Sequence, residues 1–155
     1  MVEVSELLEY NAEVRRRYFT ALAKLTWDEF VKNREASWHS IRNIFIHTLG
    51  AIDHWLDFLQ GEKLSKKFDD YKTIGEVQEY MEHVEDRMSK YLNSTWSEGL
   101  MRKYRLANDA GQDVEVTAED ILIHVFEEEV HHRGELIALL WQMDIEPPLM
   151  GWKYL

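Results

Sequence analysis

Apolar residues recur at steps of three and four positions along four long stretches of the chain, which is the period of an α-helix buried on one face. The stretches cover about residues 4–25, 37–60, 74–92 and 121–143. The apolar positions of the last stretch are Ile121, Leu122, Val125, Phe126, Val130, Leu136, Leu139 and Leu140. Four amphipathic helices joined by varied connections predict an all-α fold, a four-helix bundle that forms one domain over residues 1–155.

Polar residues mark where these helices begin and end. A Thr followed three positions later by Glu or Asp, the capping-box spacing, occurs at residues 26–29, 73–76 and 117–120. The first box predicts a short helical turn, and the other two predict the starts of the third and fourth long helices. Ser37 or a neighbouring residue is expected to open the second helix, which Gly61 ends.

The connections differ in character. The charged segment 61–71 predicts an exposed connection. Between residues 93 and 116 the helical period disappears, and MRKYRLANDAGQDVEV alternates around an NDAG turn, which predicts a short hairpin or loop excursion between helices three and four. Two prolines at 147 and 148 end regular structure. Trp152 and Tyr154 in the tail are expected to pack back onto the domain or onto a second subunit.

Composition narrows the possible chemistry. Cysteine is absent, which excludes disulfides, thiolate metal sites and cysteine nucleophiles, so any metal site must use His, Asp and Glu. The net charge of −11 argues against nucleic acid as a partner, and the arginines at 15–17 are interpreted as a solvated helix face. No apolar run of 18 residues and no signal-peptide pattern occurs, so the expectation is a cytoplasmic protein without a membrane partner.

The last helix contains a ladder of polar residues. His124, Glu128 and His132 are spaced i, i+4 and i+8, so their side chains lie along one face. Glu128 and His132 can converge on one ion from adjacent turns, and His47 in the middle of the second helix can complete the set. Two imidazoles and one carboxylate leave positions open for water or substrate, as in catalytic metal sites. Alternatively, residues 127–129 form an exposed acidic band paired with Arg133 and local lysines.

The segment HVFEEEVHHRGELIALLWQMDIEPP resembles the last-helix signature of the DinB/YfiT-like family, metal-dependent bacterial four-helix-bundle proteins unrelated to the polymerase that shares the DinB name. That signature has one histidine in the middle of helix two, a second on helix four, and a third four residues later before an Arg-Gly-Gln/Glu step. IFIHTLGAIDHWL around His47 and the HRGE step at His132 match it, whereas Glu128 replaces the second histidine. The resemblance implies a site of His47, Glu128 and His132 for one divalent ion, such as zinc, nickel, manganese or iron.

The resemblance also implies an activity. Members of the family are thought to be transferases that join low-molecular-weight thiols, such as bacillithiol or mycothiol, to electrophiles. The leading hypothesis is therefore a metal-dependent thiol transferase that forms a homodimer. Two alternatives stay open: a metal-dependent hydrolase that uses a metal-bound water, and a metal-binding, stress-related dimer without turnover.

Further polar residues are candidates for supporting roles. His124 and His54 could hydrogen-bond to a ligand or be satisfied in the core, and with Glu127 they are the candidates for a general base. Arg133 could orient a neighbouring glutamate or form a surface ion pair. His131 is rotated ~100° from His132, so it is expected near the surface rather than on the same ion.

Overall fold

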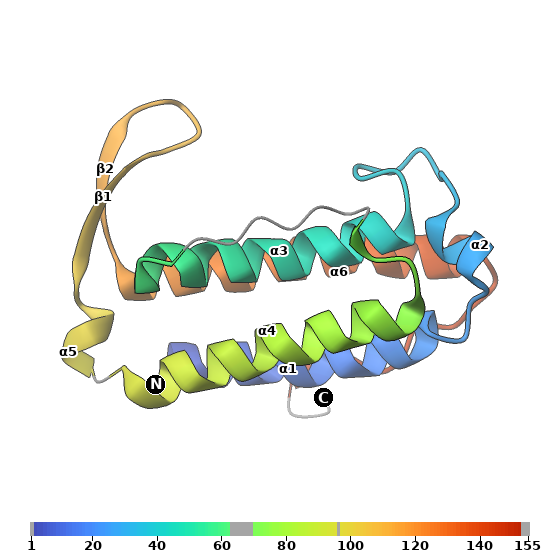
Figure 1. Ribbon diagram of the computed structural model, residues 1–155, viewed down its shortest axis with the longest axis horizontal. Helices are drawn as coiled ribbons and strands as arrows, with labels where there is room; N and C mark the ends of the chain where they lie inside the picture. Colours follow the sequence, from blue (N-terminus) through green and yellow to red (C-terminus); the bar gives the residue numbers. More distant parts are fainter. Residues whose placement is uncertain (1, 63–69, 96, 153–155) are drawn as a thin grey trace.

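Four long helices form the body of the molecule (Figure 1). The computed structural model describes residues 2–62, 70–95 and 97–152. The long helices are α1 (Val4–Leu22), α3 (Ile41–Gln60), α4 (Ile74–Ser94) and α6 (Ala118–Gln142). Two short helices and a hairpin join them: α2 (Trp27–Val31), α5 (Ser97–Leu100), β1 (Lys103–Ala107) and β2 (Asp113–Thr117). The predicted all-α four-helix bundle with a hairpin between its third and fourth long helices is confirmed.

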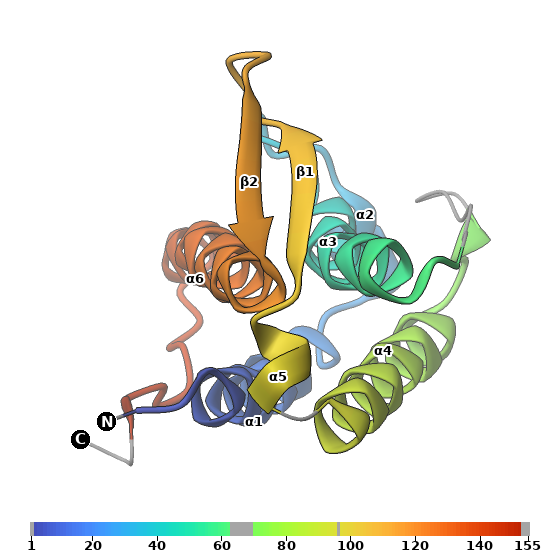
Figure 2. The same cartoon turned by 90° about the vertical axis from the view of Figure 1, so that its left-hand side faces the viewer.

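The long helices are arranged in two layers. Helices α3 and α6 lie side by side in one layer, and α1 and α4 make up the other (Figure 2). Within this arrangement α3 contacts both α6 and α4, and α1 contacts α6. The hairpin rises from the α3–α6 layer on the side away from α1 and α4 (Figures 1 and 2). The outer face of the α3–α6 layer is therefore the face that the hairpin adjoins.

Side-chain caps set the helix starts. The capping boxes predicted at Thr73 and Thr117 are present: each Thr hydroxyl accepts from the backbone N–H three residues on, at 3.1 Å in both cases. Helix α3 begins later than expected, because Ser40 accepts from the N–H of Asn43 at 3.1 Å. Trp38 consequently precedes the helix. Gly61 ends α3 in the left-handed conformation, with φ 72°, and the connection predicted after it falls largely on residues 63–69, outside the described residues.

The hairpin is antiparallel and closes as the NDAG segment predicts. Its turn is held by the Asn108 side chain, whose Oδ1 accepts from the N–H groups of Ala110 at 3.1 Å and Gln112 at 2.9 Å. Alternate strand residues share one half-buried face, and these are Tyr104, Leu106, Val114 and Val116.

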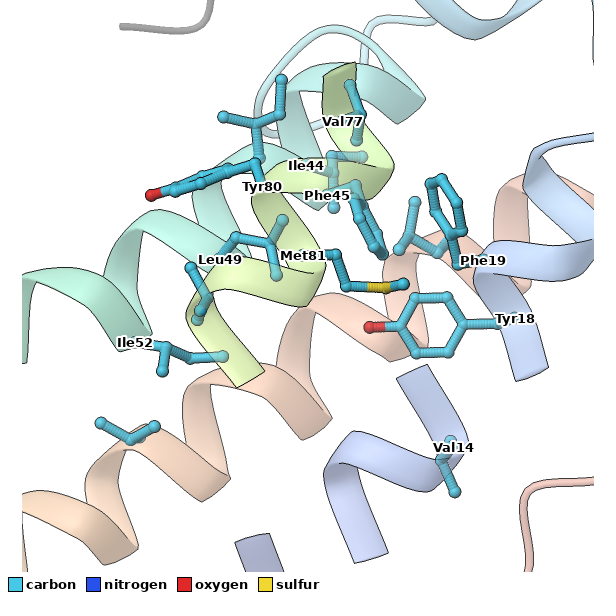
Figure 3. Packing of buried hydrophobic residues seen from close by; sticks show 14 of the residues in the cluster. Val14, Tyr18, Phe19, Ile44, Phe45, Leu49, Ile52, Val77, Tyr80 and Met81 are labelled. Carbon is cyan, nitrogen blue, oxygen red and sulfur yellow. The ribbon is translucent and has the colours of Figure 1, made fainter. Parts of the chain in front are cut away.

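The hydrophobic core lies between the two layers (Figure 3). Phe45 of α3 stacks on Phe19 of α1 with ring centroids 5.0 Å apart, and Tyr18 meets the same ring edge-on at 5.8 Å. Met81 of α4 points toward these rings (Figure 3). Among the described residues, no helix combines the length and the apolar composition needed to cross a lipid bilayer.

The C-terminal tail returns to α1. Trp152 packs edge-on against Tyr10 with centroids 5.1 Å apart, and the Tyr10 hydroxyl donates to the carbonyl of Met150 at 2.6 Å. The tail therefore packs onto its own domain, one of the two expected arrangements. Tyr154 lies outside the described residues.

Candidate metal centre

Helices α3 and α6 bring the three predicted ligands together. One donor atom from each of His47, Glu128 and His132 lies within 4.8 Å of the others. The Glu128 Oε2 atom is 3.6 Å from His132 Nε2 and 4.0 Å from His47 Nε2. Ligand atoms bound at roughly 2.1 Å around one ion are themselves about 3–4 Å apart. The group therefore fits a divalent ion in both donor chemistry and spacing.

A carboxylate that was not among the predicted site residues holds one of the imidazoles. The Nδ1 atom of His132 is 2.7 Å from Glu135 Oε2. An ionised carboxylate can only accept, so Nδ1 carries the proton and Nε2 keeps its lone pair toward Glu128 and His47. Burial alone would raise the pKa of Glu135, but hydrogen bonds from His132 and Ser37 lower it. The i, i+3 spacing of His132 and Glu135 is the sequence signal that could have revealed this contact.

Trp38 covers His47 from the connection that precedes α3. The two rings are stacked, with centroids 4.0 Å apart and planes 22° apart. Within this connection Glu35 and His39 have φ of 56° and 69°, the left-handed region that L-residues adopt at a cost. The Arg34 N–H donates to the His39 carbonyl at 2.6 Å and closes the loop. This non-helical segment therefore fixes an aromatic ring on one side of the candidate site.

Burial affects the protonation of one of the three candidate ligands, His47. Desolvation, followed by the charge of His132, lowers the pKa of His47 below its ordinary value of 6.5, although Glu128 and Glu135 oppose the shift. His47 is thus neutral at pH 7, the form that binds metals. The His132 side chain is 7% exposed and that of Glu128 is 35% exposed. The cluster opens to solvent on the glutamate side, which is where water or substrate can enter.

Two of the candidate supporting residues, His54 and His124, pack against an aromatic ring rather than among the three donors. His124 and His54 both pack edge-on against Trp55, with ring centroids 5.6 and 5.3 Å away. Both histidines are exposed, and so is Glu127. His54 and His124 lie toward the hairpin end of α3 and α6, whereas Glu127 immediately precedes Glu128 on α6.

His131 is exposed, as expected, and its ring meets that of His132 edge-on at 4.9 Å. Together with His132 and Glu135 it forms a second group of donors within 4.8 Å of one another. In that group His132 and Glu135 already satisfy each other through their hydrogen bond.

The alternative that Arg133 forms a surface ion pair is wrong, because its side chain is buried, whereas the orientation of a neighbouring glutamate by Arg133 stays a prediction. Arg133 is buried on the opposite side of α6, where its Nη1 donates to Asn11 Oδ1 at 3.3 Å. Its guanidinium lies over the Tyr10 ring, 5.3 Å from the centroid. The ~100° rotation between successive helix residues turns Arg133 toward α1 while His132 faces α3.

Glu129 also departs from the interpretation of an exposed acidic band. It is 1% exposed, and both of its oxygens accept from Arg15, at 2.7 Å from Nε and 2.7 Å from Nη2. Arg15 is buried as well, so the interpretation of residues 15–17 as a wholly solvated face is wrong. Burial by itself lowers the pKa of Arg15, but the charge and hydrogen bonds of Glu129 outweigh it and raise that pKa. Arg15 lies in the apolar stripe of α1, a signal visible in the sequence: Leu8, Asn11, Arg15, Tyr18, Leu22.

Comparison with known proteins gives consistent similarities. The DinB family model matches residues 1–153. The chain is 26% identical over 153 residues to the uncharacterized protein YizA of Bacillus subtilis (strain 168), covering 92% of this chain and 89% of that protein. It is 23% identical over 146 residues to Protein DinB of the same organism, covering 88% and 84%.

Solved structures share the fold. A DinB-like protein from Bacillus cereus ATCC 10987 superposes with a TM-score of 0.70 at 18% identity, covering 94% of this chain and 93% of that one. A conserved protein from Enterococcus faecalis superposes with a TM-score of 0.67 at 16% identity, covering 89% and 95%. At these identities the two structures bear on the fold alone.

Proposed function

Since this chain belongs to the DinB family, we propose that it is a metal-dependent transferase that joins a low-molecular-weight thiol to an electrophile. The observation that carries the proposal is the convergence of His47, Glu128 and His132 from two helices, at spacings that suit one divalent ion. The proposed ion is zinc, nickel, manganese or iron, each of which accepts this mixture of imidazole and carboxylate.

Each side chain at the candidate metal centre would have a distinct role. His47 and His132 would hold the ion through their Nε2 atoms, and Glu128 would hold it through a carboxylate oxygen. A divalent ion in this position would supply Lewis-acid chemistry and lower the pKa of a thiol or water at its open positions. Glu135 keeps the proton of His132 on Nδ1 and thereby keeps Nε2 available. The chain has no cysteine, so the nucleophilic sulfur must belong to a substrate.

The hydrolase alternative receives less support from the structure. A hydrolase needs a general base within hydrogen-bonding reach of the attacking water. His124 and His54, two candidates for that base, pack against Trp55 rather than beside the three donors. A binding protein without turnover is the remaining alternative, and a homodimer is proposed for either role.

The test begins with metal content. We expect tag-free protein to contain about one divalent ion per chain by mass spectrometry. Glu128→Ala and His132→Ala should lose the ion, while His124→Ala, a control on the same helix face, should keep it. Equal ion content in all four proteins would overturn the site.

The second step measures turnover. The metal-loaded parent is screened with electrophiles in the presence and absence of bacillithiol or mycothiol. Product that forms only with both the thiol and the ion supports the transferase, and product that forms without thiol indicates the hydrolase. Binding of the ion with no product from any pair favours the binding protein.

A further inference from the structure

A cavity lies beside the candidate metal centre, between the hairpin and the α3–α6 layer. Its volume is about 360 Å³, within the range of small-molecule pockets. The residues that line it come from α3, both strands, the turn and the first part of α6. They are Trp55, Leu106, Ala107, Asn108, Asp109, Val114, Val116, Asp120, Ile121 and His124.

The walls of this cavity are largely apolar. Leu106 pairs directly with Val114 in the hairpin, and Val116 follows on the same face. Since alternate strand residues point to opposite faces, these side chains turn toward the helices while Arg105 and Glu115 face outward and are exposed. Opposite them, Trp55 and His124 present perpendicular rings 5.6 Å apart. The cavity thus offers two apolar walls to a flat or branched molecule.

The charges of the lining are of one sign. Asp109 and Asp120 line the cavity, and no lysine or arginine from the described part of the chain joins them there. Arg102 lies over Tyr104 at 5.4 Å, outside the lining. The whole chain carries a charge of −11. An anion entering the cavity would therefore meet an unfavourable potential, whereas an uncharged ligand would not.

The cavity adjoins the metal centre along α6. His124 lines the cavity and lies four residues before Glu128, which is one helical turn or ~6 Å. A molecule seated against His124 and Trp55 would therefore extend toward the solvent-facing side of Glu128. The two sites lie on the same outer face of the α3–α6 layer.

We propose that this cavity binds an uncharged, largely apolar small molecule of aromatic or branched aliphatic character. That the cavity holds the apolar part of the electrophile rests on the proposed transferase function. That the cavity binds such a molecule at all does not. The hairpin supplies the apolar wall, the Trp55 and His124 rings supply the opposite one, and the two aspartates select against anions.

The test uses two fluorescent probes with the same ring system. N-phenyl-1-naphthylamine is uncharged, and 8-anilino-1-naphthalenesulfonate carries one negative charge. Both are titrated into the metal-free full-length chain, so the result is independent of the ion. We expect the uncharged probe to bind at least about tenfold more tightly than the sulfonate. Equal or tighter binding of the sulfonate would overturn the charge selection.

Matched variants locate the binding. Leu106→Trp fills the cavity, and Arg105→Trp places the same ring on the outward face of the same strand. Circular dichroism checks the fold of both. We expect about a tenfold or greater loss of the uncharged probe in Leu106→Trp and less than about a twofold change in Arg105→Trp. Equal affinities for the two variants would overturn the cavity as the site.

Two further variants test the charge of the lining and its independence from the ion. Asp109→Asn should raise the affinity for the sulfonate and leave that for the uncharged probe unchanged; no change for either probe would contradict the role of Asp109.

Glu128→Ala should lose the ion yet retain the uncharged probe, so failure of the metal site and failure of the cavity are distinguishable. The oligomeric state of Leu106→Trp is measured as well. If this variant changes its degree of dimerisation to the same extent as it loses the probe, the cavity is an interface between copies, and the proposal is overturned.

Discussion

Glu128 and Glu129 are adjacent in the chain and on the same helix, yet their surroundings are opposite. Glu129 faces α1, is 1% exposed and is neutralised by two hydrogen bonds from Arg15. Glu128 faces α3, is 35% exposed, and has two imidazole nitrogens at 3.6 and 4.0 Å but no cation at that distance among the described residues. One carboxylate is satisfied within the protein, and the other is left to interact with something outside it.

Burial and pairing distinguish a carboxylate that stabilises the fold from one that can bind a ligand. A buried charge costs several kcal/mol unless it is paired, so Arg15 and Glu129 exist as a unit. Glu128 is 35% exposed, so water reaches its carboxylate where no protein cation does among the described residues. Carboxylates with access to solvent and neutral imidazoles beside them are suited to a metal ion. Of these two neighbouring residues, Glu129 therefore stabilises the fold, and Glu128 is the one suited to bind an ion.

Replacing each glutamate by alanine tests this separation most severely. Glu129→Ala leaves Arg15 buried without its counter-ion, and we expect a loss of about 3–5 kcal/mol in the free energy of unfolding. Glu128→Ala and the exposed control Glu127→Ala should change it by less than about 0.5 kcal/mol. Urea denaturation of the metal-free proteins measures these values. If Glu129→Ala does not fold, Glu129→Gln provides a milder form, and equal destabilisation by the Glu128 and Glu129 substitutions would contradict the comparison.

Loss of the carboxylate behind His132 should have an intermediate effect. Glu135→Gln weakens the acceptor that keeps the His132 proton on Nδ1. We expect the affinity for the ion to fall about 10- to 100-fold, as for other groups that orient metal-binding histidines. Competition with a chelator gives the affinity, and Glu127→Gln on the same helix is the control. An affinity within about a factor of two of the parent would show that Glu135 does not orient the imidazole.

The protonation of His47 should show the smallest effect. Burial and the charge of His132 lower its pKa below 6.5, so NMR titration of the metal-free protein should give a midpoint below that value. Because the folded state binds the proton less readily than the unfolded state, this group makes stability rise with pH from the lowered pKa up to 6.5. Glu128→Gln removes a charge that raises the pKa and should lower the midpoint further. A midpoint at or above 6.5 in the parent would contradict the dominance of burial at His47.

The sequence predicted those parts of the molecule that depend on local interactions. Capping residues at 73–76 and 117–120 identified helix starts, because a Thr hydroxyl satisfies a backbone N–H only three residues away. The NDAG segment identified the hairpin for a similarly local reason, since the Asn108 side chain bonds the turn backbone. The i, i+4 spacing placed Glu128 and His132 on one face, where the structure brings His47 to meet them.

Features that depend on how helices are rotated against each other were missed. Whether Arg15 faces solvent or α6 is decided by the packing of α1. The position of Arg15 in the buried stripe of α1 was a sequence signal for burial, but the run of three arginines was interpreted as a solvated face instead. Trp38 was expected on the second helix, but Ser40 caps that helix two residues later and leaves the indole free to stack on His47. The contact between His132 and Glu135 is local, and its spacing could have predicted it.

The segment that carries Trp38 lies outside the long helices, and this has an evolutionary consequence. Its backbone adopts left-handed conformations at Glu35 and His39, and its indole covers one side of His47. Surface connections tolerate substitution and changes of length better than packed helices do. Selection could therefore alter which molecules approach His47 by changing this connection, while the four-helix scaffold and the three candidate ligands stay as they are.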